Sequence, residues 1–95
     1  PTVLADERIK EGGYQRITAR VSKVVFANAW WISFGDGYSG VIYPEHQRYF
    51  SRREVAAWEG QWLELEGWVY KASYKNRPQW RIKLETPYAV TKTDY

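Results

Sequence analysis

The sequence contains no cysteine, so disulfide bonds, thiol catalysis and thiolate metal sites are all excluded. This absence is compatible with a reducing compartment but does not establish one. No apolar run approaches the ~20 residues that a membrane-spanning helix needs, and no signal-peptide core is present. The chain begins at Pro1 rather than at Met, which predicts a processed or trimmed protein, or an excised domain of a longer one.

Residues that carry catalysis are equally scarce. The one histidine, His46, has no Ser or Cys partner in the pattern, so we interpret it as a surface or capping residue. Metal binding needs several convergent ligands, but Asp36 lies in a predicted turn and the glutamates are scattered. The glycines of residues 35–37 precede a strand rather than a helix, so they predict no phosphate-binding loop. We therefore expect a chain that is not an enzyme and has no cofactor.

Aromatic residues are what the sequence has in excess. Six Trp and eight Tyr in 95 residues are more than the core of one domain of this size needs. The predicted core aromatics are Trp30, Phe34 and Trp80, with Trp58 packing a helix onto the sheet. The surplus consists of Trp31, Tyr43, Trp68, Tyr70 and Tyr74. The net charge of +3 is modest and by itself says little about nucleic acid.

The most informative stretch is residues 29–43, which we interpret as a β-hairpin. Asp36-Gly37 is a strong signal for the turn between its two strands. With a period of two, one face is apolar and the other is mixed: Trp30, Ile32 and Phe34 against Trp31, Ser33 and Tyr43. The function depends largely on the second face.

Alternation of apolar and polar side chains predicts three more strands, at residues 14–26, 61–70 and 80–84. The first is long, and its apolar phase shifts near its end, as expected of a strand that is bent or bulged to serve two sheets. Between the hairpin and residue 61, Ser51 followed three residues later by Glu54 is a capping box that starts a helix of two to three turns.

The remaining segments are predicted as connections. We expect residues 1–13 to form an entry arm, either a linker or at most a short helical turn, and residues 44–49 an irregular crossover. Residues 71–78 are polar and rich in turn residues, which predicts a loop. Residues 88–95 form a tail that adds a strand at an edge or frays, so a single domain spans residues 14–87.

The order of elements is strand, strand, strand, helix, strand, strand. This is the order of the OB-fold, an all-β, five-stranded Greek-key barrel with one short helix between the third and fourth strands. The competing prediction, an SH3-like barrel, lacks a helix at this point.

Several segments also carry a family resemblance. They are Ala5-Asp6-Glu7-Arg8-Ile9, Trp31-Ile32-Ser33-Phe34-Gly35, Leu65-Glu66-Gly67-Trp68-Val69 and Glu85-Thr86-Pro87. Over about residues 5–87 the chain resembles the OB-like domain that accompanies thermonuclease (staphylococcal-nuclease-like) modules in some bacterial proteins. The resemblance implies an accessory nucleic-acid-binding module. No ordered set of Asp, Arg and Glu maps onto a thermonuclease active site, so no catalytic residues carry over.

An OB barrel binds single strands on the outer face of its second and third strands, between two flanking loops. Such binding needs flat π surface for the bases and cations for the phosphates. The candidate residues are Trp31, Ser33 and Tyr43 on the hairpin, Lys71, Tyr74, Lys75, Asn76 and Arg77 in the predicted loop, and Arg16 and Arg20 on the first long strand. Trp31 would stack on bases, and the loop cations would contact the backbone.

A charge-balanced surface is the alternative for the strand cations. Glu64 and Glu66 face outward and can pair across strands with Arg16 and Arg20, or with Arg81 and Lys83. The loop cations have no acidic neighbour in the sequence and are harder to neutralise.

The sequence therefore predicts a non-catalytic OB module that binds single-stranded DNA or RNA with low sequence specificity. The alternative is a protein-interaction or scaffold domain, or a carbohydrate-binding one, that uses the exposed Trp and Tyr side chains. The expected partners are a single-stranded nucleic acid, and a second protein or a parent nuclease module. We expect a monomer.

Overall fold

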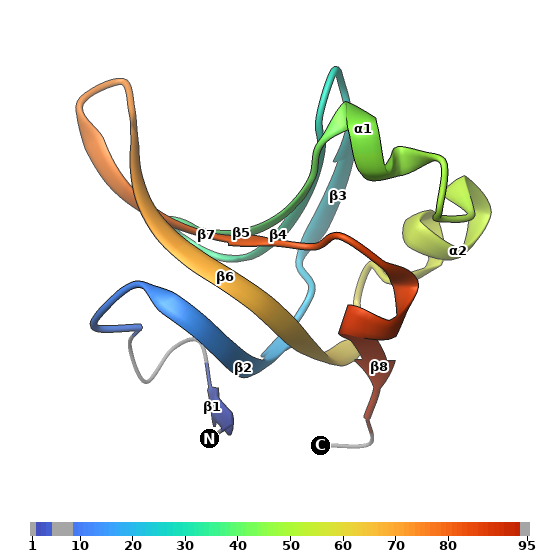
Figure 1. Cartoon of the computed structure of the whole chain (residues 1–95), viewed down its shortest axis with the longest axis horizontal. Coiled ribbons are helices and arrows are strands. Elements are labelled where there is room, and N and C mark those ends of the chain that lie inside the picture. Colours follow the sequence, from blue (N-terminus) through green and yellow to red (C-terminus); the bar gives the residue numbers. More distant parts are fainter. Residues whose placement is uncertain (1, 5–8, 94–95) are drawn as a thin grey trace.

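The computed structural model describes residues 2–4 and 9–93 and is all-β, with short helical segments beside the sheet (Figure 1). The strands are β1 (Thr2–Leu4), β2 (Gly13–Arg20), β3 (Lys23–Phe26), β4 (Trp30–Gly35), β5 (Tyr38–Ile42), β6 (Trp62–Tyr74), β7 (Arg77–Lys83) and β8 (Val90–Lys92). The helices are α1 (Pro44–Gln47) and α2 (Arg52–Ala57), and η2 (Pro87–Ala89) is a 3-10 turn. The prediction that the fold is all-β is therefore confirmed.

The strands of the described residues form one sheet with the order β1-β2-β6-β7-β5-β4-β3. The remaining strand, β8, pairs with the first part of β6. All neighbours are antiparallel except β1 with β2 and β5 with β7. The prediction of five strands in a closed barrel is corrected, because the sheet is larger and no ladder joins β2 to β3. The chain itself connects these two strands, since β3 begins three residues after β2 ends.

The junction between β2 and β3 is where the chain changes partner. β2 pairs with β6, and β3 pairs with β4. At the junction, the backbone N–H of Val21 donates to the carbonyl of Gln61 at 2.9 Å, and the N–H of Ser22 donates to the carbonyl of Ser33 at 2.8 Å. The predicted bend in this long strand is thus confirmed, although it joins two parts of one sheet.

The predicted hairpin is formed by β4 and β5. Asp36 and Gly37 make the turn, and Gly37 has a φ of 84°, which a glycine adopts without strain. Ile32 and Phe34 are buried as expected, whereas Trp30 is only half-buried and packs against the edge of the core. A bulge between Ser33 and Gly35 shifts the register before the turn.

Helix α2 follows the predicted signals. The Ser51 hydroxyl accepts a hydrogen bond from the backbone N–H of Glu54 at 3.3 Å, which caps the first turn. Val55 and Trp58 turn into the core, and Gly60 ends the segment with a φ of 84°. The preceding crossover differs from the expectation, because Pro44–Gln47 forms the short helix α1. Proline at the start of α1 costs no hydrogen bond, since the first helical N–H groups lack partners.

The polar segment at residues 71–78 is not a loop. β6 continues to Tyr74, β7 starts at Arg77, and only Lys75 and Asn76 form the turn, with φ values of 50° and 65°. Two consecutive residues with positive φ are typical of the tight turn that matches the twist of a β-hairpin. The far end of this hairpin, which we call the ribbon (residues 71–80), projects beyond the rest of the sheet (Figure 1).

Both ends of the described chain add strands. The expectation of a linker or helical turn at residues 1–13 is wrong for Thr2–Leu4, which forms β1 parallel to β2. Residues 5–8 of the predicted arm lie outside the described residues, and Ile9 is buried in the core. At the other end, β8 pairs with β6, which confirms the predicted edge strand.

The core lies inside the curve of the sheet, and α2 covers one end of it. It consists of the inward side chains of the strands together with Val55 and Trp58 from the helix. The predicted inward positions on β6 are all buried: Leu63, Leu65, Gly67 and Val69. At Gly67 an added Cβ atom would overlap the carbonyl oxygen of Lys83, so β6 and β7 approach each other at a distance that only glycine permits.

Candidate functional site

The sheet has a second face, away from the core, whose residues are fixed by strand register. Residues directly opposite each other on paired strands share a face. Trp31 lies opposite Val41, Val41 opposite Lys83, and Lys83 opposite Trp68. We call this surface of β4, β5, β7 and β6 the outer face; it comprises Trp31, Ser33, Ser39, Val41, Gln79, Arg81, Lys83, Trp68 and Tyr70.

Trp31 and Arg81 form the centre of the outer face. The guanidinium carbon of Arg81 lies 4.8 Å from the centroid of the Trp31 ring, a cation–π contact. Trp31 is half-buried, and Val41 beside it is fully buried although it lies on this face. Larger neighbours therefore cover Val41. Arg81 Nε is also buried and has no hydrogen-bond partner among the described residues. The result is a flat, positively charged platform held in place by packing.

Two tyrosines meet above β7. Tyr43 follows β5 and Tyr70 lies on β6, and their hydroxyl groups form a hydrogen bond across the strand between them. Burial, followed by this hydrogen bond, raises the pKa of Tyr70 to about 12, and a hydrogen bond with Arg81 opposes the rise. Lys83 Nζ lies 6.0 Å from the Tyr43 ring centroid. Two aromatic rings and two cations thus surround one short segment of β7.

A titration prediction follows from the tyrosine pair. In wild-type protein we expect one tyrosine to ionise near pH 12, and the Tyr70→Phe variant should lack this step. Because the folded protein favours the neutral phenol, the associated stabilisation is complete below pH 10 and is lost as the pH rises toward 12. Near-ultraviolet absorbance of tyrosinate measures both curves. A wild-type curve that ends at the ordinary tyrosine pKa would show that Tyr70 is freely solvated.

The ribbon continues the outer face. Tyr74 lies opposite Arg77, in the same alternation as Tyr70 opposite Arg81, so these four side chains share one surface. All the residues of the turn are exposed, and Lys75 Nζ lies 5.3 Å from the centroid of the Tyr74 ring. Neither Lys75 nor Arg77 forms an ion pair with any residue that the structure describes. The ribbon therefore presents uncompensated cations beside an exposed aromatic ring.

Three of the predicted cations are not next to the Trp31–Arg81 platform. Lys71 is opposite Trp80, on the reverse side of the ribbon from Tyr70. Arg16 lies 3.6 Å from Glu64 and 3.5 Å from Glu66, so the predicted cross-strand pairing is formed at this residue. Arg20 Nε donates to the carbonyl of Gly60 at 3.2 Å, beside the end of α2. The structure thus places Trp31, Tyr43, Tyr74 and Arg77 on one surface, whereas Lys71 lies on the reverse side of the ribbon and Arg16 and Arg20 are bound to neighbouring groups.

Arg81, Lys83 and Tyr70 are members of this site that sequence reasoning missed. The sequence pattern offers Arg81 and Lys83 only as partners of Glu64 and Glu66, and it offers Tyr70 only as one of the surplus aromatics. The parallel pairing of β5 with β7 sets Arg81 opposite Ser39 and beside Trp31. The sequence shows that Arg81 and Lys83 alternate with apolar residues and face outward. It does not show that their strand, β7, pairs with β5 and so places them near Trp31.

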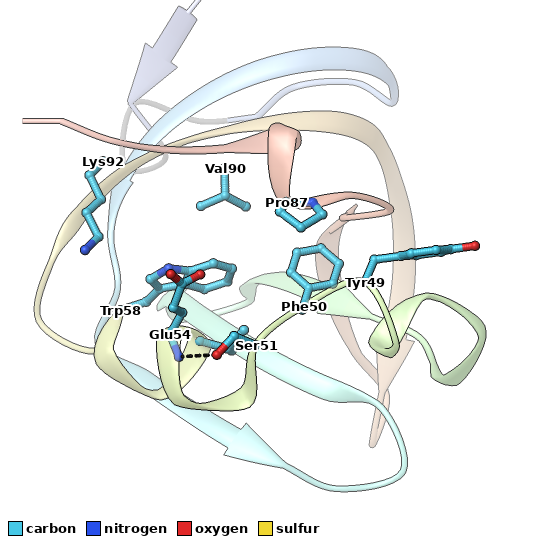
Figure 2. Close-up of a pocket in the computed structure, with 9 residues that line it drawn as sticks. Tyr49, Phe50, Ser51, Glu54, Trp58, Pro87, Val90 and Lys92 are labelled. Carbon is cyan, nitrogen blue, oxygen red and sulfur yellow. Dashed lines mark hydrogen bonds between the residues drawn. The ribbon is translucent and has the colours of Figure 1, made fainter.

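Three further features of the described residues concern His46, metal binding and a cavity. His46 is half-buried at the rim, with Nε2 3.7 Å from a Glu85 oxygen that Lys83 also approaches at 3.8 Å. Within residues 2–4 and 9–93 there is no group of three side chains that could hold a metal ion. A cavity of about 310 Å³ lies between α2 and the β8 segment, and both apolar and polar side chains line it, with Ser51, Glu54 and Lys92 among the polar ones (Figure 2).

Comparison with known proteins adds no assignment. No protein-family model matches the chain, and searches of curated proteins and of solved structures find no significant match. None of the helices formed by the described residues is long and apolar enough to cross a membrane. An assignment of function must therefore come from the chemistry of the outer face.

Proposed function

We propose that this chain is a non-catalytic module that binds single-stranded DNA or RNA, with little sequence preference, on the outer face. The observation that carries the proposal is the Trp31–Arg81 platform, which lies beside the Tyr43–Tyr70 pair and Lys83. Bases stack on aromatic rings and on guanidinium planes, whatever their identity. Each stacked base contributes about 1–3 kcal/mol.

The charge of the outer face supports the same ligand. Arg77, Arg81 and Lys83 follow one another along β7, on one side of the strand. The acid nearest to them is Glu85, which lies 3.8 Å from Lys83 at the rim. A row of cations beside stacking rings fits a polyanion whose bases are unpaired, and such binding weakens as salt rises.

We also propose an OB-type interpretation of this sheet, although no ladder between β2 and β3 closes it into a barrel. In this interpretation β2 and β3 are one bent strand, β1 and β8 are additions, and α2 lies between the third and fourth strands. The outer face then corresponds to the surface on which OB domains hold single strands. The sequence resemblance to the OB-like domain beside thermonuclease modules points to the same accessory role.

Replacement of Trp31 by alanine tests the proposal. We expect Trp31→Ala to weaken binding of fluorescent oligo(dT) and oligo(U) about tenfold or more, because a stacking platform is lost. Anisotropy titrations at low and at physiological salt give the affinities, and circular dichroism checks the fold. Trp31→Phe keeps an aromatic ring and should retain most of the binding. Flat anisotropy with wild-type protein at low salt would contradict the proposal.

A protein-binding function is the second candidate, because aromatic side chains are exposed away from the outer face. Tyr49 and Tyr88 are 55% and 94% exposed, and together with Thr86 and Pro87 they line a groove of about 460 Å³. Exposed aromatics are enriched at protein interfaces. Association that depends on protein concentration without nucleic acid, and that Tyr88→Ala removes, would favour this candidate.

A further inference from the structure

The outer face does not end at β6, because its register continues onto β2. Tyr14 lies opposite Trp68, Trp68 opposite Lys83, and Lys83 opposite Val41. With Trp31 opposite Val41, the series forms one line of neighbouring side chains at right angles to the strands. We call Tyr14, Trp68, Lys83, Val41 and Trp31 the cross-strand row.

The far end of the cross-strand row is an open aromatic corner. Tyr14 and Trp68 lie with ring centroids 5.7 Å apart and planes at 80° to each other. They are 58% and 55% exposed, far more than Trp31 at the other end. Two large rings left in solvent at a defined angle provide π surface that the fold itself does not use.

The acids beside this corner are engaged by their neighbours. The Tyr14 hydroxyl donates to Glu66 at 3.0 Å, which also raises the pKa of Tyr14. Arg16 lies within 3.6 Å of both Glu64 and Glu66. These contacts hold the two carboxylates against β2, and they compensate one of the two negative charges. On the other side of Trp68, Lys83 lies opposite it and supplies a cation between the two aromatic ends of the row.

We infer that Trp68 and Tyr14 form a second stacking station, so that a single strand of nucleic acid runs along the cross-strand row from Trp31 over Lys83 to the corner. This extension rests on the proposed function. Three strand spacings separate Trp68 from Trp31, or about 14 Å at ~4.8 Å per strand. At ~3.4 Å per stacked nucleotide, the two stations are about four nucleotides apart. The backbone crosses Lys83 between them.

The length of the ligand distinguishes one station from two. We expect Trp68→Ala to weaken binding of an oligo(dT) of about twelve nucleotides about tenfold, and to leave the affinity for about four nucleotides unchanged within twofold. Trp31→Ala should weaken binding at both lengths. Trp68→Tyr retains a ring and should restore binding of the longer ligand, and Tyr88→Ala removes an exposed ring outside the row as a control.

Cross-linking provides a second readout that does not depend on any variant. An oligonucleotide that carries 5-bromouracil at every position should cross-link wild-type protein at Trp68 or Tyr14 as well as at Trp31, as identified by mass spectrometry. Equal affinities of wild-type and Trp68→Ala protein for the longer ligand, with cross-links at Trp31 only, would overturn the second station while leaving the proposed function standing.

Two other outcomes contradict the inference in different ways. If wild-type protein binds neither length, the proposed function fails and the second station fails with it. If wild-type protein binds a glucan oligosaccharide through Trp68, and Trp68→Ala leaves the affinity for DNA unchanged, the corner is a sugar site and the inference is overturned. Full binding of the longer ligand by Trp68→Tyr, with loss in Trp68→Ala, supports it.

Discussion

Gly67→Ala is expected to destabilise the protein by about 3 kcal/mol or more, the largest stability loss that we expect of a single methyl group in this chain. Gly67 points inward on β6 between Leu65 and Val69, just where β6 begins to pair with β7. An added Cβ would overlap the backbone carbonyl of Lys83. A backbone atom in a paired strand cannot rotate away as a side chain can, so either β6 or β7 must move and the core beneath them must open.

The matched control is Gly40→Ala on β5. Its added Cβ would lie 3.1 Å from the tip of the Leu84 side chain, which can shift, and we expect a loss of about 1 kcal/mol. Chemical denaturation followed by tryptophan fluorescence measures both variants. Similar stabilities of the two would show that β6 and β7 can separate at Gly67 without disturbing the core.

Arg81→Glu should lower the affinity for single-stranded oligonucleotides about a hundredfold at low salt. The substitution removes the guanidinium from the face of Trp31 and places a carboxylate among the phosphates. It also removes the group that hydrogen bonds with Tyr70. Because Arg81 lies at the centre of the outer face, both stacking and charge are affected, and the loss should exceed that of Trp31→Ala.

Arg53→Glu is the matched control for charge. Arg53 is exposed on α2, away from the outer face, and the two variants have the same net charge. A plot of log affinity against log salt concentration should become shallower by about one unit of slope in Arg81→Glu and change little in Arg53→Glu. Equal losses in both variants would mean that binding follows the net charge alone, which would contradict a defined site.

The elements predicted correctly are those set by neighbours in the sequence. Asp36-Gly37 defines its turn through local backbone chemistry, and Ser51 caps α2 through a hydrogen bond to Glu54 three residues away. The ribbon was not predicted, because Ser73 and Pro78 are residue types common in turns and local sequence alone therefore favours a loop. In the structure Ser73 and Pro78 are paired with each other, and the positive φ angles fall at Lys75 and Asn76.

The sequence predicts which site residues face away from the core, because side chains alternate between the two faces of a strand. Alternation alone places Trp31 on the outer face, where the structure has it. It also shows that Arg81 points away from the core, since Ile82 points into it. Alternation cannot show that β7 pairs in parallel with β5, because this contact joins segments that are far apart in the chain. The Trp31–Arg81 platform therefore needed the structure.

The change of partner between β2 and β3 also sets an order of assembly. β3, β4 and β5 are consecutive strands, each paired with the next, so they can form a meander from local contacts. Before β6 is made, β2 can pair only with the three residues of β1, because its longer antiparallel partner, which places Leu65 opposite Ile17, comes much later in the chain. During synthesis β2 therefore leaves the ribosome long before β6 is available, with its apolar residues uncovered. A strand that supplies buried core residues to the finished protein, Ile17 and Ala19, is thus exposed to aggregation in the nascent chain.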